Sequence, residues 1–236
     1  MLSFIIPAYN EQDELPETLR ALREAADAAS EAYEIIVVDD ASTDATVAVA
    51  GQAGARVIPV SYRQIAAVRN AGARAASGDI LFFVDADTHI GPQHVTGALT
   101  ALREGCAGGG AWMAIRGDVP MWSRAFAWVF SALYFGANLG AGAFLFTTRA
   151  NFDASGGFDE RYYAGEEVFF TKALKELGPF KLLRDPTFTS GRKLRMHSAR
   201  EILLGTVALI LGGRRILQSR EKLEFWYSGK RERPAT

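Results

Sequence analysis

Cysteine is almost absent from this chain of 236 residues, because Cys106 is its only cysteine. A single thiol excludes an internal disulfide and the cysteine-rich zinc and iron–sulfur sites, and it is typical of a reducing compartment. With only 23 glycines, 8 prolines and 22% charged residues, the composition also excludes collagen-like and disordered chains. We therefore expect a globular protein of the cytoplasm.

The N-terminus lacks the positively charged region and the long apolar run of a signal peptide. Residues 125–148 contain no charged side chain, and this length would suffice for a membrane span. However, Gly136, Gly140 and Gly142 interrupt the stretch. We predict a buried aromatic helix over 122–135 and a short strand over 143–146, with a transmembrane helix as the alternative.

Charges are unevenly distributed along the chain, although the formal net charge is only −1. Lys and Arg outnumber Asp and Glu over residues 192–236, and the reverse holds over residues 1–191. The basic segment also contains an apolar run at 202–211. We predict a helical extension that touches an anionic membrane surface rather than nucleic acid. A solvated surface helix is the alternative.

The first 90 residues alternate between short apolar runs, typical of buried strands, and segments with apolar residues three and four apart, typical of helices. Strands are predicted over 2–6, 34–38, 56–60 and 80–84, and helices over 14–26, 42–51 with Ser42 as its cap, and 64–76. Strands joined by helices run parallel with right-handed crossovers. The pattern predicts an α/β fold with a mostly parallel central sheet and helices on both faces.

The second half carries weaker signals. We predict helices over 92–104 and 166–177, a glycine-rich turn at 108–110 and a turn-rich loop over 151–160. No linker separates the halves, so residues 1–191 are expected to form one domain on a single sheet. The extension over 192–236 follows it.

Four aspartates follow predicted strands: Asp39, Asp40, Asp85 and Asp87. The carboxyl ends of parallel strands lie along one edge of a sheet, where ligands of open α/β sheets bind. On an extended backbone Asp85 and Asp87 would point to the same side, and two close carboxylates favour a hard cation such as Mn²⁺ or Mg²⁺. The alternative is a polar strand end in which Asp87 caps a turn.

Six motifs occur in a fixed order: IIPAYNE at 5–11, VVDDASTD at 37–44, RNAG and ASGD within 69–79, DAD at 85–87, GGFDE at 156–160 and GEE at 165–167. In order and spacing they resemble the family 2 glycosyltransferases of the GT-A fold, over about residues 3–180. The resemblance implies transfer of a sugar from a nucleotide-diphosphate donor, UDP favoured over GDP, to an acceptor hydroxyl. It also implies a nucleotide-binding half over 1–90 and an acceptor-binding half over 91–191.

The resemblance implies roles for individual side chains. The nucleotide pocket would be lined by Pro7, Ala8, Tyr9, Glu11 and Ala86. Asp40 would accept a hydrogen bond from the base, and Arg69 would border the base or the diphosphate. Asp85 would face the ribose and the metal, and Asp87 would ligate the metal. A strand-terminating turn, a helix cap and a solvated arginine are the alternatives.

Transfer also needs a base, because the acceptor hydroxyl loses its proton as it attacks. Glu167 is the candidate and Glu166 the second one, since the family usually has Glu-Asp here, whereas this chain has two glutamates. Two acids that stabilise a helix N-terminus are the alternative. One base without a carboxylate nucleophile predicts inversion by a single in-line displacement.

Further candidates lie outside these motifs. Arg192 would pair with the diphosphate and His197 would complete the metal shell; surface charge and a solvated histidine are the alternatives. Trp112, Trp122 and Trp128 would form a platform for a sugar ring or lipid chain, or pack in the core. The aromatic segment and basic extension predict a lipid-linked or membrane-proximal acceptor.

Rival functions each match one feature. DADT at 85–88 resembles the haloacid-dehalogenase phosphatase signature, with Asp85 as nucleophile, but His89 stands where that signature has Thr. A sugar nucleotidyltransferase needs a glycine-rich loop after the first strand, and residues 7–11 contain no glycine. The non-enzymatic alternative is a nucleotide-sugar-binding module without a base.

Overall fold

A computed structural model of the chain describes residues 1–192, 195, 200 and 216–219. The site candidate His197 and most of the predicted extension 192–236 lie outside these residues. Within the described residues, eight strands form one sheet in the order β3-β2-β1-β4-β7-β6-β8-β5. The strands are β1 (Leu2–Ala8), β2 (Tyr33–Asp40), β3 (Arg56–Val60), β4 (Ile80–Val84), β5 (Thr88–His89), β6 (Gly108–Arg116), β7 (Phe144–Thr148) and β8 (Phe180–Ser190).

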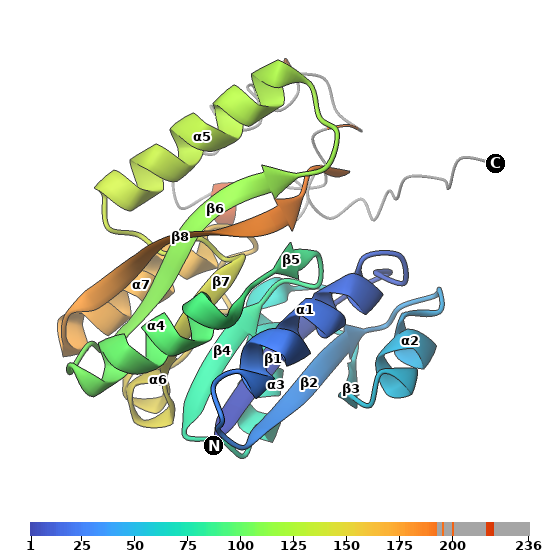
Figure 1. Cartoon of the computed structure of the whole chain (residues 1–236), viewed down its shortest axis with the longest axis horizontal. Coiled ribbons are helices and arrows are strands. Elements are labelled where there is room, and N and C mark those ends of the chain that lie inside the picture. Colours follow the sequence, from blue (N-terminus) through green and yellow to red (C-terminus); the bar gives the residue numbers. More distant parts are fainter. Residues whose placement is uncertain (193–194, 196–199, 201–215, 220–236) are drawn as a thin grey trace.

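Seven helices accompany the sheet within the described part of the chain. They are α1 (Leu15–Asp27), α2 (Thr46–Gln52), α3 (Ile65–Ala75), α4 (Pro92–Arg103), α5 (Met121–Gly136), α6 (Arg149–Ser155) and α7 (Glu166–Leu177). Figure 1 shows α5 lying over β6, at the end of the sheet remote from β3. Among the described residues, no helix is long and apolar enough to cross a membrane.

The sheet is parallel in its first half and mixed in its second. β3, β2, β1 and β4 run parallel, as predicted. β7 then pairs antiparallel with both β4 and β6, and β5 pairs antiparallel with β8. The halves 1–90 and 91–191 therefore contribute strands to the same sheet.

The two sheet faces carry separate cores, which the alternation of side chains along each strand explains. Phe4 and Ile6 of β1 pack with α1 and α4 on one face. Ile5, between them, packs with α3, α6 and α7 on the other face. Helices thus cover both faces, as the sequence predicted (Figure 1).

Three local predictions in the second half are wrong. The helix predicted over 122–135 forms as α5 but is not buried, because Trp128 and Leu133 are 63% and 68% exposed. Gly108–Gly110 is the start of β6 and not a turn. A Cβ atom at Gly109 would collide with the Phe146 ring and the Lys181 carbonyl, so glycine lets the neighbouring strands approach. The predicted loop 151–160 begins inside α6, whose N-cap Thr148 accepts a hydrogen bond from Asn151 N at 3.1 Å.

The predicted cap of the second helix is also wrong. α2 begins at Thr46, and Ser42 lies in the preceding loop. The Ser42 hydroxyl oxygen instead accepts a hydrogen bond from the backbone N–H of Asn10 at 2.9 Å. The side chain therefore joins two loops rather than satisfying a helix end.

Candidate active site

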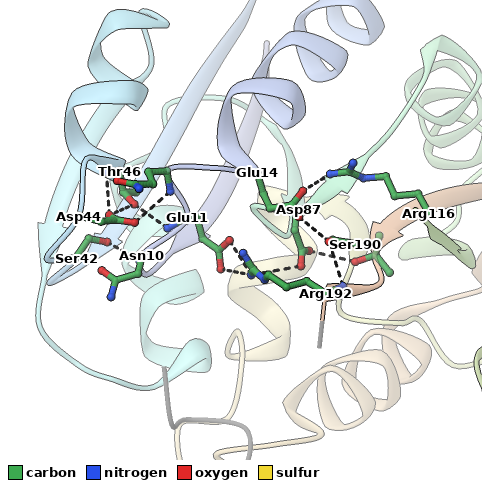
Figure 2. Close-up of polar contacts among 12 residues, drawn as sticks. Asn10, Glu11, Glu14, Ser42, Asp44, Thr46, Asp87, Arg116, Ser190 and Arg192 are labelled. Atoms are coloured by element: carbon green, nitrogen blue, oxygen red, sulfur yellow. Dashed lines mark hydrogen bonds and ion pairs between the residues drawn. The ribbon is translucent and has the colours of Figure 1, made fainter. Parts of the chain in front are cut away.

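The loop after β1 is fixed to the loop after β2 by hydrogen bonds between backbone and side chains. Asn10 N donates to Ser42, and Glu11 N donates to the Thr46 hydroxyl at 2.7 Å (Figure 2). In the other direction, Thr43 N donates to Asn10 Oδ1 at 2.8 Å. Asn10 has φ +53°, a conformation that asparagine tolerates better than most residues. These contacts hold the 9–11 segment at the carboxyl edge of the sheet.

Asp40 ends β2 and organises the loop that follows β3. Its Oδ1 accepts hydrogen bonds from Tyr62 N at 2.7 Å and from Arg63 N at 3.0 Å. The Arg63 guanidinium carbon lies 3.4 Å from the centre of the Tyr9 ring, a cation–π contact. Asp40, predicted to accept a hydrogen bond from the base, and Tyr9, predicted to line the nucleotide pocket, are thus joined through Arg63.

Three further residues predicted to line the pocket, Pro7, Ala8 and Ala86, lie at or just after the carboxyl ends of β1 and β4. Ala8 pairs with Asp39 in the β1–β2 register, and Pro7 pairs with Val38. The Ala8 and Ala86 side chains are buried in the core. Any contact of these two alanines with a ligand would therefore be made by their backbone.

Arg69 lies at the centre of the site and is buried. Its Nη1 donates to Glu166 Oε1 at 2.5 Å, and its Nη2 donates to Asp85 Oδ1 at 2.8 Å and to the Gly142 carbonyl at 2.9 Å. One guanidinium therefore links the end of β4 to the first turn of α7. The family resemblance placed Arg69 beside the base or the diphosphate and did not imply its contact with Glu166.

The glutamate pair begins α7, directly after Gly165, whose φ of +73° is a left-handed conformation that glycine adopts without a Cβ clash. Glu166 is buried, and burial together with the charge of Glu167 raises its pKa above the usual glutamate range, while the neighbouring Arg69 guanidinium opposes this shift. Glu167 is half-buried, and burial raises its pKa as well. A carboxylate with a raised pKa is a stronger base near neutral pH.

Tyr134 of α5 is a site residue that the sequence analysis missed. Its hydroxyl donates a hydrogen bond to Glu167 Oε1 at 3.3 Å, and its ring stacks on Phe130, with 4.4 Å between the ring centres. Burial and the nearby Glu167 raise the pKa of the tyrosine, which therefore remains a donor. The sequence offers little to single out this tyrosine, which stands in a mostly apolar helix.

Asp87 faces a different group of side chains from Asp85. Residues 85–88 form a turn, closed by the hydrogen bond from Thr88 N to the Asp85 carbonyl at 3.0 Å, so the predicted alternation of an extended backbone does not apply. Asp87 Oδ1 accepts a hydrogen bond from the Thr189 hydroxyl at 3.1 Å. Its Oδ2 lies 3.9 Å from Arg192 Nη2.

The donor set fits a hard divalent ion in chemistry, since carboxylate oxygens are the preferred ligands of Mg²⁺ and Mn²⁺. Asp85 and Asp87 retain 31% and 17% side-chain exposure, so both are accessible to a ligand. In the described part of the chain no three His, Cys, Asp or Glu side chains converge as an all-protein metal cage. This arrangement suits an ion held by one or two carboxylates together with substrate phosphates.

The three tryptophans predicted to form a platform, Trp112, Trp122 and Trp128, differ in how far they are exposed. Trp112 of β6 packs on Phe135 of α5, with 5.3 Å between the ring centres. Trp122 is half-buried, whereas Trp128 is 63% exposed. The three therefore do not share one environment.

Comparison with known sequences identifies related proteins. The profile described as "Glycosyl transferase family 2" matches residues 3–154. An undecaprenyl-phosphate 4-deoxy-4-formamido-L-arabinose transferase from Salmonella choleraesuis is 34% identical over 112 residues, which cover 44% of this chain and 34% of that protein. The Edwardsiella ictaluri protein of the same name is 35% identical over the same shares. The chain thus spans about a third of the length of these relatives.

Comparison with solved structures shows the fold. Staphylococcus aureus TarS 1-349 in complex with UDP-GlcNAc matches with a TM-score of 0.65 at 19% identity, over 96% of this chain and 72% of that one. The mannosyltransferase PcManGT from Pyrobaculum calidifontis, in complex with GDP-Man and Mn²⁺, matches with a TM-score of 0.63 at 20% identity, over 79% and 56%.

Proposed function

Because the chain belongs to glycosyltransferase family 2 and has the GT-A fold, we propose that it transfers a sugar from a nucleotide-diphosphate donor to an acceptor hydroxyl with inversion. A UDP-sugar is favoured over a GDP-sugar. Residues 1–90 would bind the nucleotide and residues 91–191 the acceptor. Family membership decides against the haloacid-dehalogenase and nucleotidyltransferase alternatives.

The observation that carries this proposal is the link from the strand-end carboxylate to the glutamate pair through Arg69. Asp85 and Glu166 contact the same guanidinium, so the donor side and the acceptor side of the site are held at a fixed separation. Such pre-organisation favours an in-line displacement, because the reacting groups need little rearrangement.

Glu167 is the proposed base and Glu166 the residue that positions Arg69. Glu166 is engaged by Arg69, whereas Glu167 is more exposed and is oriented by Tyr134. Glu167 would accept the proton of the acceptor hydroxyl as that oxygen attacks the anomeric carbon and the diphosphate leaves. A bound Mn²⁺ or Mg²⁺, held by Asp85 and Asp87, would supply charge neutralisation at the departing diphosphate.

The acceptor is proposed to be lipid-linked, with the enzyme peripheral at the inner face of a membrane. The outer face of α5 supports this proposal. Its small residues Ser123, Ala127 and Ser131 are buried against the protein, while Met121, Trp128, Val129 and Leu133 are 87%, 63%, 49% and 68% exposed. This surface, which we call the α5 outer face, is accompanied on the helix by a single charged residue, Arg124. A tryptophan among aliphatic side chains and a cation suits a lipid interface.

Removal of the base tests the proposal. We expect Glu167→Gln to lower transfer of sugar from a UDP-sugar by about 100-fold or more, while nucleotide affinity stays within about threefold. Glu176→Gln, an exposed carboxylate on the same helix, is the matched control and should retain full transfer. Equal activity of the Glu167→Gln variant and the wild type would reject Glu167 as the base.

A further inference from the structure

Arg192 is an internal cation shared by two acids from separate loops. Its Nη2 lies 2.9 Å from both carboxylate oxygens of Glu11 and 3.9 Å from Asp87 Oδ2 (Figure 2). Glu11 follows β1 and Asp87 follows β4, whereas Arg192 comes two residues after β8. The side chains of all three are largely buried, with 6% exposure for Arg192. Segments distant in the sequence therefore meet around the Arg192 guanidinium.

The neighbouring acid, Glu14, makes its direct contacts with other side chains. Glu14 pairs with Arg116 and accepts a hydrogen bond from the Ser190 hydroxyl at 2.6 Å (Figure 2). Two arginines therefore serve separate acids here: Arg116 pairs with Glu14 and Glu17, and Arg192 pairs with Glu11 and Asp87. Of these two arginines, Arg192 is the one that lies within 4 Å of Asp87, the candidate metal ligand.

The Arg192 guanidinium is not fully satisfied in this position. Its Nε is buried and has no hydrogen-bond partner in the part of the chain that the structure describes. An unpaired buried donor is costly, and the hydrogen bonds to Glu11 and the charge of Asp87 offset this cost. A guanidinium with an unused donor can gain by moving to a ligand with more acceptor oxygens, such as a diphosphate.

We propose that Glu11 and Asp87 form a cation site in which Arg192 and a divalent metal ion exclude each other. Arg192 would neutralise the two carboxylates while no donor is bound. The divalent ion would replace it there, and the guanidinium would pair with the incoming diphosphate. This inference rests on the proposed function, and it adds Glu11 as a carboxylate of the metal site and Arg192 as the resident cation.

Charge explains why the two cations would alternate. A guanidinium and a divalent ion between the same two carboxylates would repel each other at close range. The exchange avoids this repulsion, because the ion compensates Glu11 and Asp87 while the arginine compensates phosphate oxygens. Donor binding would thereby be coupled to a movement of the chain at residue 192.

The inference can be tested without measuring sugar transfer. Mn²⁺ is titrated into the nucleotide-free protein, and the electron paramagnetic resonance signal reports the free Mn²⁺. We expect Arg192→Gln to bind Mn²⁺ about tenfold more tightly than the wild type, because the competing cation is gone. The gain should disappear in Glu11→Gln/Arg192→Gln. With saturating Mn²⁺ the order should reverse, and Arg192→Gln should bind UDP about tenfold more weakly.

Arg116→Gln is the matched control, because it removes one positive charge from the adjacent ion pair. An equal gain in Mn²⁺ affinity in this control would show a general charge effect and overturn the inference. Unchanged or weaker Mn²⁺ binding by Arg192→Gln, or no Mn²⁺ binding by any variant, would also overturn it. If Arg192→Gln unfolds, Arg192→Lys keeps the charge, and it should keep the low Mn²⁺ affinity but lose UDP affinity.

Failure of the proposed function would be distinguishable. If the wild type binds neither UDP nor GDP with Mn²⁺ present, the proposed donor is wrong whatever the Mn²⁺ titrations give. If it binds a nucleotide but Arg192→Gln shows no gain in Mn²⁺ affinity, only the exchange is wrong.

Discussion

Arg69 of α3 and Glu166 of α7 form a buried ion pair, with 2.5 Å between Nη1 and Oε1. The two residues are far apart in the sequence and lie on helices of the same sheet face. Because Arg69 also contacts Asp85, the pair fixes the first turn of α7 relative to the end of β4. The geometry of the candidate active site thus depends on one buried guanidinium.

Replacing this guanidinium should destabilise the protein strongly. We expect Arg69→Met to lower the free energy of unfolding by about 3–5 kcal/mol, because the buried Glu166 loses its cation. Chemical denaturation followed by circular dichroism measures the change. Arg20→Met removes an exposed ion pair with Glu24 and should cost no more than about 1 kcal/mol. Similar losses in the two variants would contradict a central role for Arg69.

The hydrogen bond from Tyr134 should appear in the pH dependence of transfer. Burial raises the pKa of Glu167, so we expect kcat/KM to rise with pH along a limb above the usual glutamate range. The Tyr134 hydroxyl stabilises the ionised carboxylate and opposes this shift. Tyr134→Phe should therefore raise the pKa further and move the limb to higher pH.

A pH–rate profile of the wild type and of Tyr134→Phe checks this prediction. Tyr163→Phe is the control, because it changes a different tyrosine from the one that contacts Glu167. A merely structural role of Tyr134 would lower activity equally at every pH. A limb that stays in place would contradict the role of Tyr134 in tuning the base.

Much of the fold follows from local sequence pattern. The apolar run of β4 and the helical spacing of α7 predict both elements with their observed bounds, Ile80–Val84 and Glu166–Leu177. β6 and β8 were missed. The three glycines of β6 indicate a turn, and the charges and Pro186 of β8 interrupt its apolar pattern. Their pairing depends on close approach of neighbouring strands, which local periodicity does not encode.

The candidate site, like the fold, could be predicted from the sequence only in part. The position of Asp40 and Asp85 at strand ends follows from the topology of a parallel sheet. The contacts of Tyr134 with Glu167 and of Arg192 with Glu11 join residues that are far apart in the sequence. No pattern along the chain specifies such contacts, because they depend on how α5 and the end of β8 pack against the rest.

The α5 outer face should carry affinity for lipid. We expect Trp128→Ser/Leu133→Ser to weaken binding to vesicles that contain anionic lipid by about tenfold or more, because exposed apolar area that would enter the interface is lost. Vesicle co-sedimentation measures the change, and UDP affinity should be unaffected. Leu177→Ser removes an exposed leucine from α7 and should bind vesicles like the wild type. Equal vesicle binding by all three proteins would contradict a lipid contact at α5.

The central claim is that the strand-end carboxylates bind a nucleotide diphosphate with a divalent ion. Calorimetric titration of UDP and of GDP into the protein, with and without Mn²⁺, tests it most directly when repeated with Asp87→Ala. We expect Mn²⁺-dependent binding, tighter for UDP than for GDP, that weakens by about tenfold or more in the variant. Absence of binding of either nucleotide in the presence of Mn²⁺, or unchanged affinity in Asp87→Ala, would contradict the proposed site.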